Sequence, residues 1–172
     1  TPPATVTGKS FLDILKSGRS GVVDPTRSVM LAGKERHDIG RPNDWGYPVR
    51  AIRTADFLYI RNYEPDRWPA GNPETGYTNV DNSPTKEFLL SNFDEHYRLS
   101  FGKRPPEELY EIRKDPDCVK NLAADLAFAR VKRDLQSRME HLLKEENDPR
   151  LSGNAAFFDT IAGTLGPQVG VY

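Results

Sequence analysis

The sequence predicts an α+β domain in which one long helix packs against a small antiparallel sheet, with shorter helices and long loops around them. Two observations carry most of this prediction. Residues 47–63 alternate apolar and polar side chains around a tight turn, which is typical of a β-hairpin. Residues 121–146 carry apolar side chains three to five positions apart, which is typical of an amphipathic helix. The length of 172 residues suits one such domain.

The hairpin is the clearest element of the sequence. Its first strand reads Tyr47-Pro-Val-Arg-Ala-Ile-Arg-Thr, its turn is Ala55-Asp56, and its second strand spans residues 57–63, rich in aromatic and β-branched side chains. Two shorter strands are predicted at residues 29–32, an apolar run, and at residues 108–113, which alternate. All four strands are short, as expected for a small sheet.

Three helical segments are predicted. The long helix begins near Asn121 or Asp125 and ends at Glu146, before the helix-breaking Asp148-Pro-Arg. A second helix has Pro84 at its first position, Ser83 or Thr85 as its cap, and its end at Phe101. A short helix starts at Ser10. The apolar stripe of the long helix consists of Leu122, Leu126, Val131, Leu135, Met139 and Leu142.

The remaining segments are predicted to be irregular. Residues 1–8 form an extended lead, residues 9–150 the folded domain, and residues 151–172 a tail without an interpretable pattern. Residues 64–84 form a long loop, and such loops in compact domains are usually functional or packed on another part of the protein. Trp68 and Tyr77 within this loop are unusual choices for free solvent.

The composition excludes some classes of function. The formal net charge is -1, so there is no general attraction toward nucleic acid or an anionic membrane, and we expect neither as a partner. No apolar run is long enough to span a bilayer. The single cysteine, Cys118, rules out an intrachain disulfide but leaves the compartment open. Its acidic neighbours predict a passive thiol, because a reactive cysteine needs a positive environment.

The candidate site is the charged loop that follows the first strand. Gly33 permits a sharp turn there, and Glu35, Arg36 and His37 bring together three ionisable types. An arginine can hold a carboxylate or sulfate through two parallel hydrogen bonds. A histidine can donate to an anion or carry a proton near neutral pH. We therefore predict that Glu35, Arg36 and His37 contact a substrate.

Other polar residues are assigned structural roles. The three histidines are separated in sequence and form no metal-binding motif. His141 is predicted to lie on the surface, and His96 to cap or pack near a helix end. Asp81-Asn82 is predicted to form a turn. The strand arginines are expected to pair with acids or to extend toward solvent. These arginines are Arg50, Arg53 and Arg61.

Several segments, in order, resemble the C-terminal part of sulfatases, and of the N-sulfoglucosamine sulfohydrolase (heparan N-sulfatase) type in particular. The resemblance covers roughly residues 7–150. The segments are Thr7-Gly-Lys-Ser-Phe-Leu, Gly33-Lys-Glu-Arg-His, the hairpin, Pro65-Asp-Arg-Trp-Pro-Ala-Gly, and Glu108-Leu-Tyr-Glu-Ile-Arg-Lys-Asp-Pro-Asp-Cys-Val-Lys-Asn-Leu-Ala. In this family the C-terminal subdomain has a four-stranded antiparallel sheet with a packed helix.

The resemblance implies a fragment of a hydrolase that acts on sulfate esters or sulfamates of sugars. The calcium ion and the formylglycine nucleophile are expected on an N-terminal catalytic domain, which would be the principal partner. This chain alone is then expected to be inactive and to need no cofactor, because Cys118 does not fit the C-x-P-x-R motif. The loop at Glu35, Arg36 and His37 would line the rim of the substrate pocket. Periplasmic or secreted localisation of the parent follows from the family alone.

Two other interpretations remain open. The chain could be an independent carbohydrate- or protein-binding module, with Trp45, Trp68 and Tyr77 as the residues that stack on a sugar. It could also be a structural domain whose apolar faces dock a neighbour. A domain cut from its partner should expose an apolar patch, and we expect self-association through that patch.

Overall fold

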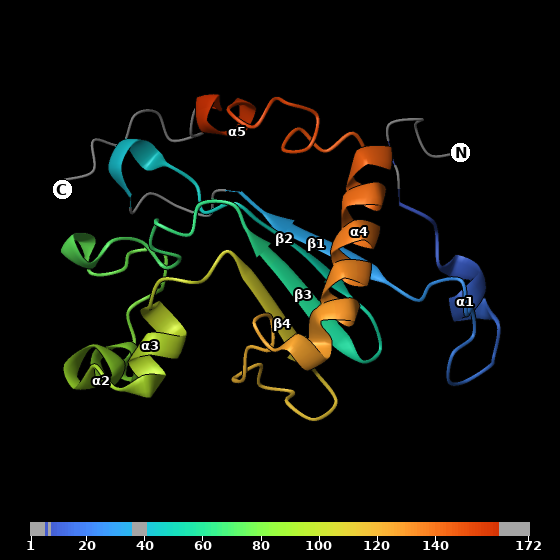
Figure 1. Cartoon of the computed structure of the whole chain (residues 1–172), viewed down its shortest axis with the longest axis horizontal. Coiled ribbons are helices and arrows are strands. Elements are labelled where there is room, and N and C mark those ends of the chain that lie inside the picture. The colour runs from blue at the N-terminus through green and yellow to red at the C-terminus, as the bar shows by residue number, and fades with distance from the viewer. Residues whose placement is uncertain (1–5, 7, 36–40, 162–172) are drawn as a thin grey trace.

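The computed structural model describes residue 6, residues 8–35 and residues 41–161. Four strands form one antiparallel sheet in the order of the chain. They are β1 (Met30–Lys34), β2 (Val49–Arg53), β3 (Phe57–Asn62) and β4 (Glu107–Glu111). The predicted fold class and the four-stranded sheet are therefore confirmed. Figure 1 shows how the helices are placed around the sheet.

The predicted hairpin forms the centre of the sheet. Strands β2 and β3 pair antiparallel, with Ile52 opposite Tyr59 and Arg53 opposite Leu58. The side chain of Thr54 closes the turn, since its hydroxyl accepts hydrogen bonds from the backbone N–H groups of Asp56 and Phe57. This side-chain bond fixes the register of the two central strands.

One face of the sheet is covered by the long helix α4 (Ala129–Glu145), which crosses the strands in Figure 1. The main core lies between them, and its sheet residues are fully buried. The sheet contributes Ile52, Tyr59 and Leu109, and the helix contributes Leu135, Met139 and Leu143. The opposite face of the sheet has no covering helix in the described part of the chain, and it carries the cavity described below.

The long helix begins later than predicted. Asn121 and Asp125 lie before it, and Asp125 caps a 3-10 turn, η3 (Leu126–Phe128), by accepting from Ala127 N–H. Residues 121–123 instead run beside β4: the side chain of Asn121 accepts from Leu109 N–H. The apolar spacing continued through this segment by coincidence, and Leu126 is 89% exposed.

The second predicted helix is two helices, α2 (Pro84–Asn92) and α3 (Glu95–Phe101). Ser83 caps α2 as predicted. The break falls at Phe93, whose φ of 35° lies in the left-handed region, and at Asp94, whose carboxylate accepts from two backbone N–H groups of α3. An aspartate that caps a new helix ends the preceding one, because its own backbone is extended.

The loop predicted over residues 64–84 ends at residue 83, where α2 follows, and it is irregular apart from one 3-10 turn, η2 (Pro73–Thr75), but it packs within this chain. Tyr77 and Ala70 form a second small core with Phe101 of α3. The buried ammonium of Lys86 holds the loop by donating to the carbonyl oxygens of Tyr77 and Val80 and to the side chain of Asn82. Neighbouring elements of this chain thus supply packing for the loop, including Phe101 of α3 and Lys86 of α2.

Two short helices and one 3-10 turn complete the fold. Helix α1 (Leu12–Lys16) lies at one end of the sheet and α5 (Phe157–Thr160) lies near the C-terminal end of α4 (Figure 1). The turn η1 is Pro42–Asp44. Helix α1 buries none of its residues, although Leu12 and Leu15 are apolar. Within the described ranges, no helix combines the length and apolar content needed to cross a bilayer.

Candidate functional site

The end of β1 sends two neighbouring charged residues to opposite sides of the sheet. Glu35 contacts charged groups on the side covered by α4, whereas Lys34 lines the cavity on the uncovered side. Alternation of side chains along a strand accounts for this division. The backbone carbonyl of Glu35 also accepts from Tyr47 N–H at 2.8 Å, which closes the base of the segment between them. The candidate site therefore has two parts.

The first part is a group of four charged side chains that we call the ion clasp: Glu35, Arg50, Asp148 and Arg150. Arg50 of β2 donates to both oxygens of Asp148, at 2.7 and 3.2 Å, and lies 2.7 Å from Oε1 of Glu35. Arg150 holds the same Glu35 carboxylate through Nε and Nη2, the latter at 2.6 Å. The Glu35 carboxylate is thus shared by two guanidinium groups, and the Asp148 carboxylate accepts from the guanidinium of Arg50 and from the backbone N–H of Arg150.

The ion clasp is buried, and this burial indicates a role in holding the fold together. The side chains of Arg50 and Arg150 are 7% and 5% exposed, and those of Glu35 and Asp148 are 16% and 12% exposed. Burial alone would lower the pKa of Arg50, but hydrogen bonds and charges from Asp148 and Glu35 raise it instead. Buried charges persist only when paired and hydrogen-bonded, so the clasp ties β1, β2 and the segment after α4 together.

Gly33 leaves room for the clasp. A Cβ placed on Gly33 would lie 3.0 Å from Cδ of Arg50 and 3.3 Å from its Nε. The ring of Phe158 lies near both guanidinium groups, 5.7 Å from that of Arg50 and 5.6 Å from that of Arg150. The lack of a side chain at Gly33 therefore makes space for Arg50, and the Phe158 ring packs against both arginines.

The structure describes one of the three predicted site residues. Glu35 lies in the ion clasp, with its carboxylate shared by Arg50 and Arg150. Arg36 and His37 lie outside the described residues. Contact between these three residues and a substrate stays a prediction.

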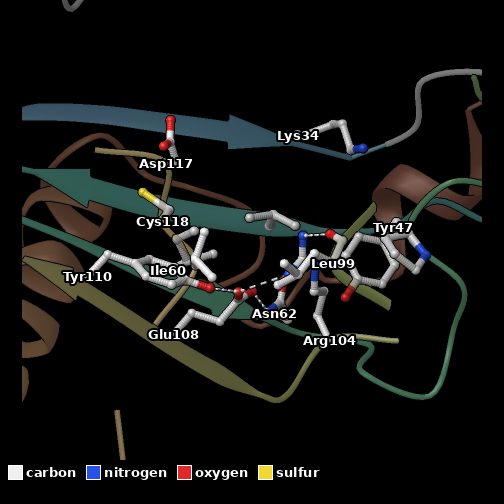
Figure 2. A pocket seen from close by; sticks show the side chains of 13 residues that line it. Lys34, Tyr47, Ile60, Asn62, Leu99, Arg104, Glu108, Tyr110, Asp117 and Cys118 are labelled. Atoms are coloured by element: carbon white, nitrogen blue, oxygen red, sulfur yellow. Dashed lines mark hydrogen bonds and ion pairs between the residues drawn. The ribbon is translucent and has the colours of Figure 1, made fainter. Parts of the chain in front are cut away.

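The second part of the site is a cavity of about 320 Å³ on the uncovered face of the sheet, which we call the sheet-face cavity (Figure 2). Lys34 and Tyr47 lie at one end, and Asp117 and Cys118 lie at the other. Apolar side chains form much of its wall. These are Val49, Ile60, Pro69, Leu99 and Val119.

A buried hydrogen-bond network forms the floor of this cavity. Glu108 of β4 accepts from the side-chain amide of Asn62 at 2.8 Å and from the hydroxyl of Tyr110 at 2.5 Å. The guanidinium of Arg104 lies 3.7 Å from the same carboxylate and donates to the carbonyl of Leu99. Glu108 is 4% exposed, so these partners replace the water it has lost.

Tyr47, unlike Glu108, has a buried polar group without a described hydrogen-bond partner. It is 3% exposed, and its hydroxyl has no hydrogen-bond partner among the described residues. Burial and the charge of Glu108 raise its pKa to about 12, against the opposing charges of Arg104 and Arg41. Lys34, whose ammonium lies 6.0 Å from the Tyr47 ring centroid, forms no ion pair with a described residue. Burial and the charge of Arg41 lower the pKa of Lys34.

Most of the other polar candidates have structural roles. The side chain of His141 is 72% exposed, as predicted, whereas that of His96, predicted to cap or pack near a helix end, is 78% exposed. Burial and the nearby Asp115 raise the pKa of the Cys118 thiol, as expected for a passive cysteine. Asn82 binds Lys86 beside its turn. No cluster of three or more histidine, cysteine or acidic side chains suited to a metal occurs in the described ranges.

Most of the aromatic candidates for sugar stacking are already packed against other residues of this chain. Tyr77 is 4% exposed within the second core, so its predicted role as an exposed stacking residue is wrong. Trp68 packs against the same core and has the ammonium of Lys103 over its ring at 5.4 Å. Trp45 is 41% exposed, with the guanidinium of Arg67 at 5.0 Å from its ring.

Comparison with known proteins gives one informative likeness. No family model matches the chain, and neither does any curated protein sequence. Among solved structures, the chain is similar to BT4656 in complex with its substrate D-glucosamine-2-N,6-O-disulfate. The TM-score is 0.51 and the identity 16%, over 86% of this chain and 22% of that chain. This likeness shows a shared fold.

Two further solved structures are similar at a lower level. BT1596, a 2-O GAG sulfatase, matches with a TM-score of 0.49 and 17% identity, over 88% of this chain and 23% of that chain. A protein from Bacteroides thetaiotaomicron with a provisional assignment as a sulfatase gives the same values. We base no argument on these two. In all three cases the chain spans less than a quarter of the matched structure.

Sequence reasoning missed most of the second part of the site. Tyr47 was assigned only to the hairpin, and no role was given to Lys34, Arg104 or Glu108. The available signal was the alternation of Lys34 with Glu35 at a strand end, which places one charge on each face. The partners Asp148 and Arg150 lie about a hundred residues from Arg50, and sequence spacing carries no signal for such a contact.

Proposed function

We propose that this chain is the C-terminal subdomain of a sulfatase, in which it forms part of the wall of the substrate pocket. The observation that carries the proposal is the fold shared with BT4656, whose substrate is a doubly sulfated amino sugar. The ordered sequence resemblance to sulfatases over roughly residues 7–150 points the same way. The nucleophile and the calcium site are assigned to an N-terminal domain outside this chain.

Within this proposal, the residues after β1 act on the substrate without performing chemistry. Arg36 and His37 contact an anionic or hydroxyl group of the sugar, and Glu35 holds the chain immediately before them. The support for the role of Glu35 is its burial and its pairing with Arg50 and Arg150, which fix its carboxylate. A wall of this kind contributes orientation and specificity.

The partner of the chain is the N-terminal catalytic domain. The apolar side chains of Phe11, Leu12 and Leu15 are between 50% and 69% exposed and offer it a surface. Such a surface also supports the expected self-association of the isolated chain, since monomers rarely expose large apolar patches. Sedimentation at several concentrations tests this point, and a monomer at every concentration would contradict it.

The first test of the proposal concerns the reading frame upstream of Thr1. We expect a C/S-x-P-x-R motif and a pair of aspartate and asparagine residues suited to calcium. A frame that lacks both would contradict the proposal. The isolated chain, assayed on a chromogenic sulfate ester, should show no turnover, because the nucleophile is assigned elsewhere.

The second test uses the full-length parent. Replacement of Arg36 or His37 by alanine should raise KM for a sulfated sugar about tenfold or more, because one charge-assisted hydrogen bond is worth roughly 1.5–3 kcal/mol. The matched control is Arg113→Ala, since Arg113 is 69% exposed and pairs with Asp56 beside the distant hairpin turn. Unchanged kinetics in all three variants across several sulfated sugars would contradict the proposal that Arg36 and His37 contact the substrate.

The binding-module interpretation receives less support. Of its three aromatic residues, Tyr77 is buried and Trp68 is packed against the second core, which leaves Trp45. One exposed tryptophan with an arginine over its ring makes a small stacking surface.

A further inference from the structure

One end of the sheet-face cavity gathers positive charge around a single phenol. The ammonium of Lys34 and the guanidinium of Arg41 lie 6.0 and 5.8 Å from the ring centroid of Tyr47. Arg104 lines the same cavity, next to Tyr47 in Figure 2. Glu108 faces this group, but it already accepts hydrogen bonds from Asn62 and Tyr110. Glu108 lies 3.7 Å from Arg104, whereas no described acid forms an ion pair with Lys34.

The hydroxyl of Tyr47 gives an independent reason to expect a ligand. It is buried and has no partner among the described residues, whereas the hydroxyls of Tyr59 and Tyr110 are each bonded to a carboxylate. Buried polar groups without partners are rare in native proteins and call for a bound group or a water. An acceptor that carries negative charge would satisfy the hydroxyl of Tyr47 and the ammonium of Lys34 together.

The rest of the cavity restricts the kind of acceptor. Its wall is largely apolar, through residues such as Val49 and Ile60, and its volume of about 320 Å³ lies at the small end of the range for ligand sites. An apolar wall suits the C–H face of a sugar ring, and the carboxylate of Asp117 at the far end suits ring hydroxyls. An inorganic anion alone would make no apolar contact with this wall, so a sugar that carries an anionic group fits the cavity better.

We propose that the sheet-face cavity is a subsite for one acidic sugar unit of a glycan, with the anionic group of that sugar held between Lys34, Tyr47 and Arg104. This subsite lies on the opposite side of β1 from the Glu35 carboxylate, and it rests on the proposed function for its glycan ligand. A carboxylate and a sulfate ester share the required chemistry, so the experiment distinguishes between them.

The experiment titrates the 172-residue chain with four probes and follows binding by NMR. The probes are glucuronate, N-acetylglucosamine 6-sulfate, neutral N-acetylglucosamine and inorganic sulfate. At least one acidic sugar should bind about tenfold or more tightly than the neutral sugar and the free sulfate. The ratio of the affinities for the two acidic sugars shows whether the cavity prefers a carboxylate or a sulfate ester. Equal affinity for acidic and neutral sugars, or binding of no sugar, would overturn the proposal.

Three substitutions locate the bound group. Lys34→Gln should weaken binding of the acidic sugar about tenfold, and Lys34→Arg should retain most of it, because Arg keeps the charge. Tyr47→Phe should weaken binding about threefold or more through loss of one hydrogen bond. The matched control is Arg130→Gln on α4, which removes the same charge from a side chain that is 87% exposed. Equal affinities for Lys34→Gln and Arg130→Gln would place the sugar elsewhere.

Failure of this proposal and failure of the proposed function give different results. Absence of sulfatase signatures upstream of Thr1, together with selective binding of acidic sugars, would leave the subsite in place on a different kind of protein. Presence of those signatures, with no selective binding at Lys34, would leave the sulfatase subdomain without this subsite. Chemical shift changes confined to the residues that line the cavity, on all four strands and in the adjoining loops, are expected for binding there.

Discussion

The ion clasp and the sheet-face cavity lie on opposite sides of one strand end and differ in how completely their charges are paired. In the clasp, Glu35 and Asp148 each accept from guanidinium groups at 2.6–3.2 Å. In the cavity, the hydroxyl of Tyr47 has no partner and the ammonium of Lys34 has no ion pair among the described residues. Both parts are polar, but only the clasp has all of its charged groups paired among the described residues.

The difference separates groups that hold the fold from groups that await a ligand. A buried charge whose hydrogen bonds are complete has little capacity to bind anything else, and its removal destabilises the fold. A group with unused bonding capacity contributes little to stability and is available to a partner. Lys34 and Glu35 are consecutive in sequence, yet on this criterion they have opposite roles. The following predictions test that contrast.

The largest effect is expected for Arg50→Ala, which leaves Asp148 buried without a guanidinium partner and Glu35 with Arg150 alone. Breaking a buried pair costs about 3–5 kcal/mol of the free energy of unfolding. Arg61→Ala is the control, since Arg61 is 41% exposed with its acid partner at 3.8 Å, and should cost less than about 1 kcal/mol. Urea unfolding of both variants measures the difference. Equal losses would show that burial of the clasp has no energetic consequence.

A smaller loss is expected for Gly33→Ala. The new methyl group would meet Arg50 at 3.0 Å, and Arg50 cannot shift without weakening its bonds to Asp148 and Glu35. Overpacking of this kind costs about 1–3 kcal/mol. Gly8→Ala provides the control, because nothing lies within 4 Å of a Cβ at Gly8. Thermal unfolding should show a lower midpoint for Gly33→Ala alone, and an unchanged midpoint would mean that Arg50 has room to move.

Two tyrosines on opposite faces of the sheet should respond differently to loss of the hydroxyl. Tyr59→Phe removes a hydrogen bond to Glu107 at 2.6 Å and should cost about 1–1.5 kcal/mol of unfolding free energy. Tyr47→Phe removes a hydroxyl without a described partner and should be neutral or slightly stabilising. Chemical denaturation of the two variants makes the comparison. A cost for Tyr47→Phe as large as that for Tyr59→Phe would show that the Tyr47 hydroxyl is bonded in the folded protein.

The smallest effect concerns acid stability on the face covered by α4. Burial opposes ionisation of Glu107, but hydrogen bonds from Tyr59 and Lys132 outweigh it and lower the pKa of Glu107 from 4.5. A carboxyl with a lowered pKa stabilises the fold above pH 4.5, and this contribution is lost as the pH falls through the folded-state pKa.

Glu107→Gln should therefore reduce the loss of unfolding free energy below pH 4.5, by less than about 1 kcal/mol, relative to the native chain. Glu95→Gln, at a side chain that is 69% exposed, is the matched control for removing one carboxyl. Urea unfolding at pH 3 to 6 measures the slopes. Parallel slopes for all three proteins would contradict the assignment of this contribution to Glu107.

The sequence predicted the sheet and its covering helix because both depend on local periodicity. Ile52, Tyr59 and Met139 lie in the main core, as alternation and helical spacing require. The errors occur where a side chain bonds to the backbone instead. Asp94 divides one predicted helix into two by capping α3, and Asn121 holds its segment beside β4. An aspartate or asparagine within an apolar pattern was the available signal at both places.

The candidate site was less predictable because its contacts are long-range. The charged types at the end of β1 correctly marked a polar region, but the pairing of Glu35 with Arg150 joins residues 115 positions apart. Which of two neighbouring charges is paired depends on the face that each occupies and on what the fold brings there. Periodicity gives the face, and only the folded chain gives the partner.

Residues 36–40 lie between two positions that are each fastened by guanidinium groups. On one side, Glu35 is held by Arg50 and Arg150. On the other side, Arg41 is 2% exposed and donates to the carbonyl oxygens of Trp45, Trp68 and Pro69. Changes of length or sequence between Glu35 and Arg41 need not disturb the sheet. Under the proposed function, in which Arg36 and His37 contact the sugar, exchange of this segment would change selectivity while the contacts that hold Glu35 and Arg41 stay the same.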